Sequence, residues 1–405
     1  MSTTLHHTLA NTAASLPTDL DLLRRYQDLG IREVFSVPCS ITRSWTEHAL
    51  AADRRREWRF RLTSHESNLP GLAAGVYLGT GRSALVHLQN SGLPYVGEGL
   101  ISMASQAVSG IPLSLLVTYR GADDRENSEP HQEIGRRTDV LVQALLGDEA
   151  RVYGNRNGDG VLDDLERSVL AARAGGIGVL KLSDSGFRMT RSPAPGQGLA
   201  AAGPLQPRRR RSPPAIASRP MPRDDALGAI VDRHPDAAIL VCNGYNARAL
   251  RAVADQPGNF YNVGYMGGTL AMGWSLAHSR PDLEVVVIDG DQNALMSCMK
   301  DTLWHDHPAN LHWYILDNQV GASVGGAPSL PLPDVMGELA CVIQTLPDPQ
   351  GSFVHPRVGA HGARFDAAPP AELAGRLASL TWRFRHWAEG RSADVSHPPT
   401  ERTPA

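Results

Sequence analysis

The stretch that decides the fold is residues 285–326, VVVIDGDQNALMSCMKDTLWHDHPANLHWYILDNQVGASVGG. Two apolar runs within it, residues 285–288 and 313–316, have the length and composition of strands that are buried on both faces. The helix expected between them carries three apolar residues on one side, Leu295, Met296 and Met299. Asp291 and Asn318 follow the two runs. A right-handed strand, helix and strand unit brings the carboxyl ends of both strands to one sheet edge, so we expect these two side chains to share a ligand-binding edge.

The same alternation of short apolar runs and helical patterns extends along most of the 405 residues. The chain is long enough for two domains that each bury a core of their own. We therefore predict an α/β protein in which two domains each contain a mainly parallel sheet flanked by helices. The predicted order is a tail at 1–16, a domain at 17–187, a Pro- and Arg-rich linker at 188–222, a domain at 223–389 and a tail at 390–405.

Composition and charge argue against several classes of protein. The formal net charge is −3, so no overall field favours nucleic acid or an anionic membrane. The arginines at 208–211 are interpreted as a solvated part of the linker. The four cysteines form no CxxC pair, and the sequence shows neither a signal peptide nor a membrane-spanning run. These features predict a cytoplasmic protein with reduced thiols and no nucleic-acid or membrane partner.

Oxygen-bearing groups at the expected sheet edge indicate a metal site. The Asp291 carboxylate, the Asn318 amide oxygen and nearby backbone carbonyls are hard ligands that suit Mg²⁺ or Ca²⁺. On local evidence alone, both residues can equally be ordinary turn residues at strand ends. The arrangement of Gly290, Asp291 and Asn318 in DGDQNALM and LDNQVGASVGG resembles the diphosphate-binding signature of thiamine diphosphate (ThDP) enzymes. Among these enzymes, the chain is most similar to the group of phosphonopyruvate and sulfopyruvate decarboxylases.

The resemblance implies a Mg²⁺ ion held by Asp291, Asn318 and the backbone carbonyl of Val320. It also implies that Asp291 and Asn318 contact the cofactor, together with Gly290, Gln292, Asn293, Asn243 and Gly244. Two positions depart from the family pattern. Asn243 replaces a Thr, and Gln292 replaces a Gly at a point where a side chain can crowd the phosphates or strain the backbone.

The aminopyrimidine ring of the cofactor is expected to contact the first half of the chain. Glu66 precedes a small-residue helix at 71–81, where a carboxylate facing a neighbour would lose solvent and have a raised pKa. By resemblance, Glu66 hydrogen-bonds this ring, and Asn90 and Ser91 of the segment QNSGL lie beside it. The alternative for Glu66 is a helix-start residue that complements the helix dipole.

The segment FYNVGYMGG, residues 260–268, resembles the turn that supports the bent shape of the cofactor. The resemblance implies that the Gly264 carbonyl accepts a hydrogen bond from the 4′-amino group. It also implies that Met266 wedges between the two cofactor rings. Without the resemblance, Met266 would be interpreted as a residue that fills the core.

Arg120 and His131 are predicted to contact the substrate. Arg120 follows a strand expected at 113–118 and offers a forked donor to phosphonate or carboxylate oxygens. His131 lies in the segment EPH and can donate a proton or a hydrogen bond. The alternatives are a surface ion pair for Arg120 and a plain loop position for His131.

The two predicted domains resemble the pyrimidine-binding and diphosphate-binding domains of a minimal ThDP enzyme. The resemblance covers residues 17–326 and is weaker beyond them. It implies a homodimer or a higher homo-oligomer, in which Glu66 of one chain faces Met266 and Asp291 of another. The predicted catalytic residues are Glu66, Arg120 and His131.

The predicted reaction is the ThDP- and Mg²⁺-dependent, non-oxidative decarboxylation of a small 2-oxo acid. The resemblance favours 3-phosphonopyruvate, which would yield phosphonoacetaldehyde and CO₂ in the biosynthesis of phosphonate natural products. Sulfopyruvate decarboxylation and carboligation are alternatives that use the same residues. Gln292 and the short region after Gly326 also leave open a cofactor-free structural or regulatory paralogue.

Overall fold

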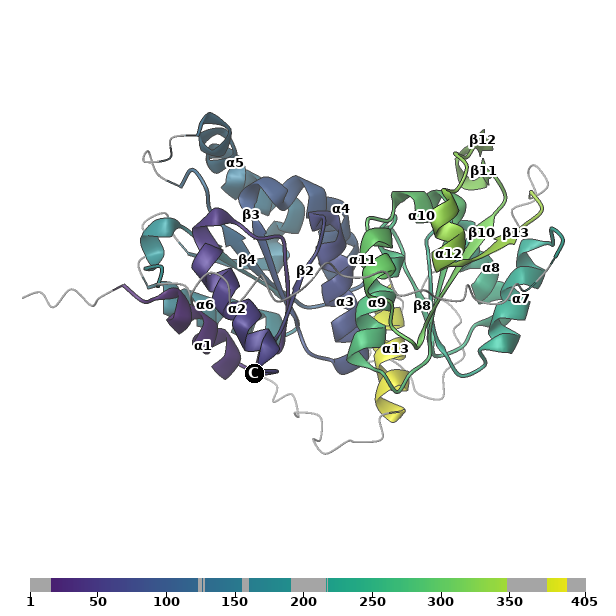
Figure 1. The fold of residues 1–405 in the computed structure, drawn as a ribbon, viewed down its shortest axis with the longest axis horizontal. Coiled ribbons are helices and arrows are strands. Elements are labelled where there is room, and N and C mark those ends of the chain that lie inside the picture. The colour runs from purple at the N-terminus through teal and green to yellow at the C-terminus, as the bar shows by residue number, and fades with distance from the viewer. Residues whose placement is uncertain are drawn as a thin grey trace, which may run out of the picture.

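The computed structural model describes residues 16–122, 126, 128–154, 160–190, 216, 218–347 and 377–391. Most of the predicted linker at 188–222, the strand predicted at 352–358 and most of both predicted tails lie outside these residues. The described chain contains a six-stranded sheet, a five-stranded sheet and a two-stranded hairpin (Figure 1). Helices cover both faces of the two large sheets, whose strands are all parallel, and the predicted α/β fold class is confirmed.

The first sheet has the strand order β2-β1-β3-β4-β6-β5. Its strands are β1 (Glu33–Ser36), β2 (Arg59–Leu62), β3 (Leu85–Gln89), β4 (Leu113–Thr118), β5 (Ala150–Tyr153) and β6 (Ile177–Leu182). One face is covered by α1 (Asp19–Asp28), α2 (Arg43–Arg54) and α6 (Val161–Arg173). The other is covered by α3 (Leu69–Thr80), α4 (Leu93–Ala104) and α5 (Glu129–Leu146). Burial on both faces explains the continuous apolar runs that the strands show in the sequence.

The second sheet has the strand order β13-β10-β9-β7-β8. Its strands are β7 (Ala238–Val241), β8 (Asn259–Tyr261), β9 (Val285–Gly290), β10 (Leu311–Asp317) and β13 (Cys341–Gln344). Residues of α7 (Arg223–Arg233) and α8 (Tyr245–Ala254) cover one face. The other face is covered by α9 (Thr269–Ser279), α11 (Lys300–His305), α12 (Asp334–Leu339) and α13 (Ala378–Gly390). The hairpin of β11 (Val320–Gly321) and β12 (Ala327–Pro328) follows β10.

The two sheets are joined through a tight contact between α3 and α9, at the centre of Figure 1. Gly71 of α3 lies against Ala271, and a Cβ on Gly75 would lie only 2.0 Å from Ser275 Oγ and 2.2 Å from the Met272 carbonyl oxygen. Residue numbers increase together along both helices, so the helices run in the same direction. Their N-terminal ends, which follow Glu66 and Met266, therefore lie at the same end of the contact.

The segment after Asp291 departs from two expectations. The helix predicted to carry Leu295, Met296 and Met299 on one side is instead split into α10 (Asp291–Met296) and α11. The prediction is wrong because the backbone becomes extended at Ser297, which leaves Met296 53% exposed while Met299 is buried. The short region after Gly326 also contains α12 and β13, which the apolar pattern did not predict.

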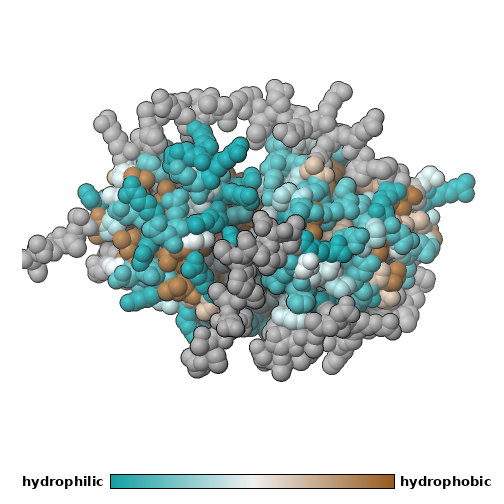
Figure 2. Space-filling model, turned by 90° about the horizontal axis from the view of Figure 1, so that it is seen from below, coloured by the Kyte–Doolittle hydropathy of each residue, from teal (hydrophilic) through white to brown (hydrophobic). Residues whose placement is uncertain are grey.

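The described surface seen from below is mainly hydrophilic, with hydrophobic residues in scattered patches (Figure 2). The apolar residues instead form three buried clusters, one of which extends across both sheets. Among the helices that the structure describes, none combines the length and the hydropathy that crossing a membrane requires.

Candidate active site

A pocket opens at the carboxyl edge of the second sheet, where β7, β9 and β10 end. It is lined by all the residues that were predicted to hold the diphosphate and the metal: Asn243, Gly244, Gly290, Asp291, Gln292, Asn293, Asn318 and Val320. The parallel pairing of β9 with β10 and with β7 brings the three strand ends together, as expected for this topology. The structure thus gathers these residues in one place, and their individual roles stay predictions.

Asp291 has the environment of a cation ligand. Its Oδ1 accepts a hydrogen bond from the Gln292 backbone amide at 2.9 Å, whereas its Oδ2 is buried and has no hydrogen-bond partner among the described residues. Burial raises the pKa of Asp291, and nearby Asp317 adds to that rise. A buried carboxylate oxygen without a donor is costly, and a divalent cation would satisfy it. Asn318 and Val320 line the same pocket, and their oxygens are of the hard kind that suits Mg²⁺.

Gln292 sits in this pocket without backbone strain. It lies in α10, and it is not among the described non-glycine residues with positive φ. Its side chain lies against Gly321, where an added Cβ would come within 2.6 Å of the Gln292 Nε2. Because Gly321 has no side chain, the Gln292 side chain has room beside it. The backbone strain that was considered for Gln292 does not occur.

Glu66 lies near the segments that were expected to surround the cofactor ring. It begins a short 3₁₀ helix, η2 (Glu66–Asn68), directly before α3. Its side chain approaches Gly92, where an added Cβ would lie 3.0 Å from Glu66 Oε1. Asn90 is buried and donates hydrogen bonds to the Arg120 carbonyl and to Thr138 Oγ1, both at 2.8 Å. The Asn90 amide thus holds the strand ends together, so its predicted place beside the cofactor is a matter for experiment.

The turn that contains Met266 contacts the Glu66 segment within the same chain. The Tyr265 hydroxyl donates a hydrogen bond to the Ser67 carbonyl, and its ring packs against α3 and α4. Met266 is 52% exposed, so the interpretation of Met266 as a core residue is wrong. The Gly264 carbonyl accepts a hydrogen bond from Asn243 Nδ2 at 3.3 Å. The cofactor contacts of Gly264, and a site that spans two subunits, stay predictions.

A second pocket lies at the carboxyl edge of the first sheet and contains Arg120. The Arg120 guanidinium forms a two-pronged ion pair with Glu126, at 2.6 and 3.0 Å, and also donates to Ser40 Oγ at 2.7 Å. Arg120 is thus an ion-pair partner, as the alternative proposed, but the two side chains are only 18% and 10% exposed, so the pair is largely buried. The predicted contact of Arg120 with the substrate stays a prediction. Hydrogen bonds from Arg120 lower the pKa of Glu126 to about 2.

His131 lies beside this ion pair. Its Nδ1 is 3.6 Å from Glu126 Oε2 and is buried without a hydrogen-bond partner among the described residues. It belongs to the first turn of α5, so its interpretation as a loop residue is wrong. The structure therefore brings Arg120 and His131 to the same carboxylate, Glu126, although His131 does not line the Arg120 pocket. Neither residue lines the pocket of Asp291.

Comparisons with known proteins decide the family. The chain is 30% identical over 324 residues to a phosphonopyruvate decarboxylase of Streptomyces viridochromogenes, covering 76% of both chains. It is also 30% identical over 329 residues to the phosphonopyruvate decarboxylase of Streptomyces hygroscopicus, covering 76% of this chain and 75% of that one. The chain belongs to the phosphonopyruvate decarboxylase family. The family recognised from residues 290–318 is thereby confirmed.

More distant relatives of this family member agree with the assignment. Over 89 residues, 22% of this chain, it is 37% identical to the sulfopyruvate decarboxylase subunit beta of Methanothermobacter thermautotrophicus, covering 48% of that protein. A solved structure from Mycobacterium smegmatis, described as a thiamin diphosphate-dependent enzyme, matches with a TM-score of 0.55 and 13% identity. The match covers 82% of this chain and all of that one, and it shows the fold. A scan against models of known protein families found no match.

Two residues of this phosphonopyruvate decarboxylase family member stand out only in the structure. Gln319, between Asn318 and Val320, has φ of 60°, a left-handed conformation that is uncommon without glycine and that clusters at functional sites. Glu98 of α4 faces the Met266 turn, where burial raises its pKa while bonds from Ser102 and the Met266 backbone oppose the rise. Gln319 lies within the segment LDNQVGASVGG, but the sequence does not show its left-handed backbone, and Glu98 lies in no recognised motif.

Proposed function

We propose that this chain catalyses the ThDP- and Mg²⁺-dependent, non-oxidative decarboxylation of 3-phosphonopyruvate to phosphonoacetaldehyde and CO₂. The observation that carries the proposal is the buried, unpaired Asp291 Oδ2, placed in one pocket with the other residues expected to bind a diphosphate. The names of the two Streptomyces relatives support the substrate. A role in the biosynthesis of phosphonate natural products would follow from that product.

The proposed cofactor contacts divide between the two sheets. Asp291, Asn318 and the Val320 carbonyl would hold Mg²⁺, and the strand-end turns around them would hold the diphosphate. Glu66 would hydrogen-bond the aminopyrimidine ring, and Met266, being exposed, would be available to support the bent cofactor. Bound ThDP supplies the electron sink that allows a 2-oxo acid to lose CO₂.

The substrate contacts are proposed at Arg120 and His131. Loss of CO₂ leaves an electron pair on the former carbonyl carbon, which must gain a proton before the aldehyde is released. His131, whose Nδ1 has no hydrogen-bond partner among the described residues, is the proposed donor. Glu126 neutralises Arg120 in this structure, so the phosphonate would have to replace Glu126 as the partner of the guanidinium.

A homodimer or larger assembly is part of the proposal. Exposed hydrophobic side chains support a further interface, because Tyr95, Met266 and Met296 are each more than half exposed, at 60%, 52% and 53%. In such an assembly Glu66 of one chain would complete the site of another. Light scattering of the loaded protein would test this, since a monomer that binds ThDP and is fully active would contradict it.

The decisive experiment has two stages. Calorimetric titration of ThDP in Mg²⁺ into the full-length chain should show saturable binding, and its absence would favour the cofactor-free paralogue. Steady-state assays should then give a higher kcat/KM for phosphonopyruvate than for sulfopyruvate or pyruvate. Faster turnover of sulfopyruvate would favour the activity named for the methanogen relatives. An acyloin product would favour a carboligase.

Glu66→Gln separates binding from catalysis. It should retain ThDP binding and lower kcat by about 10²–10⁴-fold, the usual contribution of a positioned acid or base. Asp163→Asn is the matched control, because Asp163 is an exposed first-turn acid of α6 that can act only on the helix dipole. Equal activity of both variants would assign Glu66 to the dipole alternative.

A further inference from the structure

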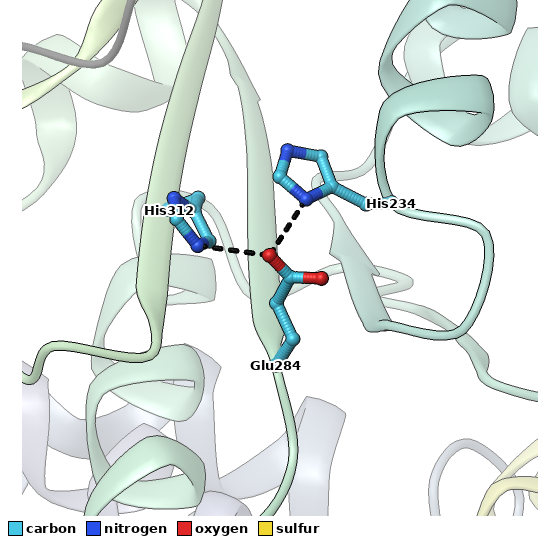
Figure 3. A group of neighbouring side chains, drawn as sticks. All are labelled: His234, Glu284 and His312. Atoms are coloured by element: carbon cyan, nitrogen blue, oxygen red, sulfur yellow. Dashed lines mark hydrogen bonds and ion pairs between the residues drawn. The ribbon is translucent and has the colours of Figure 1, made fainter.

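Three potential metal ligands meet at the edge of the second sheet opposite to the candidate active site (Figure 3). His234 caps the C-terminal end of α7, Glu284 directly precedes β9, and His312 is the second residue of β10. Both imidazole rings point to one carboxylate oxygen: His234 Nδ1 lies 2.9 Å and His312 Nε2 lies 3.1 Å from Glu284 Oε1. In the described part of the chain, no other three His, Cys, Asp or Glu side chains gather in this way.

We propose that His234, Glu284 and His312 form a binding site for a transition-metal ion such as Zn²⁺. The three ligand atoms already lie within 4.8 Å of one another. Two ligands of a tetrahedral Zn²⁺ are about 3.3 Å apart, since each bond is about 2.0–2.1 Å long. The observed 2.9 and 3.1 Å separations therefore need to widen by only a few tenths of an ångström. Two imidazoles and one carboxylate, with water in the fourth position, are a ligand set that Zn²⁺ commonly takes.

The backbone fixes the three ligands before any metal arrives. The Ala238 amide donates to the Glu284 carbonyl at 2.8 Å, and the Ala237 amide donates to the His234 carbonyl at 3.2 Å. In the β9–β10 ladder, His312 is aligned with Val286, and Val286 lies two residues after Glu284 in the chain. A metal would therefore find its ligands on three elements whose relative positions are set by the sheet, which reduces the entropy cost of binding.

Tyr314 provides an outer-shell partner that suits metal binding. Its hydroxyl lies 2.8 Å from His234 Nε2, at the other side of the ring from Glu284. A neutral imidazole carries only one N–H group. Without a metal, Nδ1 can carry the proton and donate to Glu284, while Nε2 accepts from the Tyr314 hydroxyl. When a metal binds Nδ1, the proton is carried by Nε2, which then donates to Tyr314. Such hydrogen bonds from the second ring nitrogen are usual for histidine ligands.

The burial of the group allows a metal both to enter and to stay. The side chains of His234, His312 and Glu284 are 6%, 30% and 43% exposed, so one ligand is held in the interior and the carboxylate can adjust from the surface. Arg233 lies close to Tyr314, so a metal ion bound here would be repelled by the positive charge of this arginine. The six residues of β9 separate Glu284 from Asp291, which places the two sites about 20 Å apart. The proposed site is thus independent of the cofactor.

The test uses the full-length, tag-free chain after removal of metals with a chelator. Calorimetry with Zn²⁺ should show one tight site per chain, and Co²⁺ should give the absorption spectrum of a four-coordinate ion with nitrogen and oxygen ligands. Zn²⁺ should also raise the melting temperature, because it binds the folded chain. His312→Gln and Glu284→Gln should each weaken Zn²⁺ by more than about 100-fold, and Tyr314→Phe by about 10–100-fold, as for an outer-shell partner.

His278→Gln is the matched control. His278 also lies beside a carboxylate, with its Nε2 3.2 Å from Asp306 Oδ2, but it does not belong to a three-ligand group in the described chain. Zn²⁺ binding by this variant should equal that of the wild type. The proposal is wrong if the wild-type chain shows no stoichiometric Zn²⁺ site. It is also wrong if His312→Gln and Glu284→Gln bind Zn²⁺ as the wild type does. If either variant fails to fold, the other variant and the Co²⁺ spectrum of the wild type decide.

Discussion

The two pockets at the carboxyl edges of the two sheets differ in how their charged groups are neutralised. In the first sheet, Arg120 and Glu126 already satisfy each other through a two-pronged ion pair. In the second, Asp291 Oδ2 is buried and has no hydrogen-bond partner among the described residues, although the Ser329 hydroxyl lies close enough to lower the pKa of Asp291. The charged groups of one pocket are therefore paired without a ligand, whereas the proposed cation would pair the carboxylate of the other. On the proposed function, the first pocket would have to exchange Glu126 for an anionic substrate, and the second would bind the metal.

The largest effect is expected from Asp291→Asn. Loss of the carboxylate should weaken ThDP binding in Mg²⁺ by at least about 100-fold, more than the loss of an outer-shell partner would. The same change should stabilise the apoprotein, since burial raises the pKa of Asp291 and thus disfavours its ionised form. Calorimetry and urea unfolding measure the two effects. Asp301→Asn, an exposed acid in α11, is the control. A variant that binds ThDP normally would show that Asp291 is only a turn residue.

The Arg120–Glu126 pair gives the next largest effect, on substrate binding. Arg120→Ala should lower kcat/KM for phosphonopyruvate by about 10–100-fold, the cost of charge-assisted hydrogen bonds of about 1.5–3 kcal/mol. Glu126→Gln should lower KM, because the guanidinium no longer has a competing carboxylate. Steady-state kinetics measure both variants, with the half-exposed Arg25–Glu166 pair as the control through Arg25→Ala. If KM changes in the same direction in both variants, the pair is structural.

A substitution in the contact between α3 and α9 tests whether both pockets depend on this one contact between the two sheets. Gly75→Ala should destabilise the chain by about 1–3 kcal/mol, because the added Cβ would collide with Ser275 and the Met272 carbonyl. Gly337→Ala is the matched control in α12, where an added Cβ meets nothing within 4 Å. It should stabilise by about 0.5–1 kcal/mol, since alanine favours a helix. Urea unfolding measures the sign of both changes in the free energy of unfolding. If Gly75→Ala leaves this free energy unchanged, the two helices can move apart at little energetic cost.

The parts of this fold that the sequence predicted are those with local signals. The strand at β4 was predicted with the same bounds because all six of its residues are buried. The start of α1 also has a local signal, because Thr18 and Asp21 form a capping box. Asp291 and Asn318 could be placed at one sheet edge because each follows a strand of the same parallel unit, whereas the other pocket residues were named from the family resemblance. For these elements, the local sequence patterns and the parallel sheet topology predict the same arrangement.

The features that sequence reasoning missed have no signal in the pattern of apolar residues. The ion pair joins Arg120 to a glutamate that lies in no motif, and His234, Glu284 and His312 come from three separate elements. The end of α10 at Met296 also has no local signal, because nothing in the apolar pattern marks Ser297 as extended. A buried charge can be recognised only when the structure shows what surrounds it.

The last prediction concerns the pH dependence of stability at Asp289, which lies two residues before Asp291 but faces the core. Its Oδ2 accepts a hydrogen bond from Trp313 Nε1 at 3.0 Å, and burial raises its pKa to about 7. The unfolded chain loses this proton near pH 4, whereas the folded chain keeps it until about pH 7. The folded state thus binds more protons in between, so the free energy of unfolding should fall as pH rises, by up to about 1.4 kcal/mol per pH unit. Asp289→Asn should remove this part of the slope, and urea unfolding between about pH 5 and about pH 8 measures the difference from the wild type. The Asp301→Asn control should keep the slope, and an Asp289→Asn variant that also keeps it would place the raised pKa at another group, such as Asp291 or Glu98.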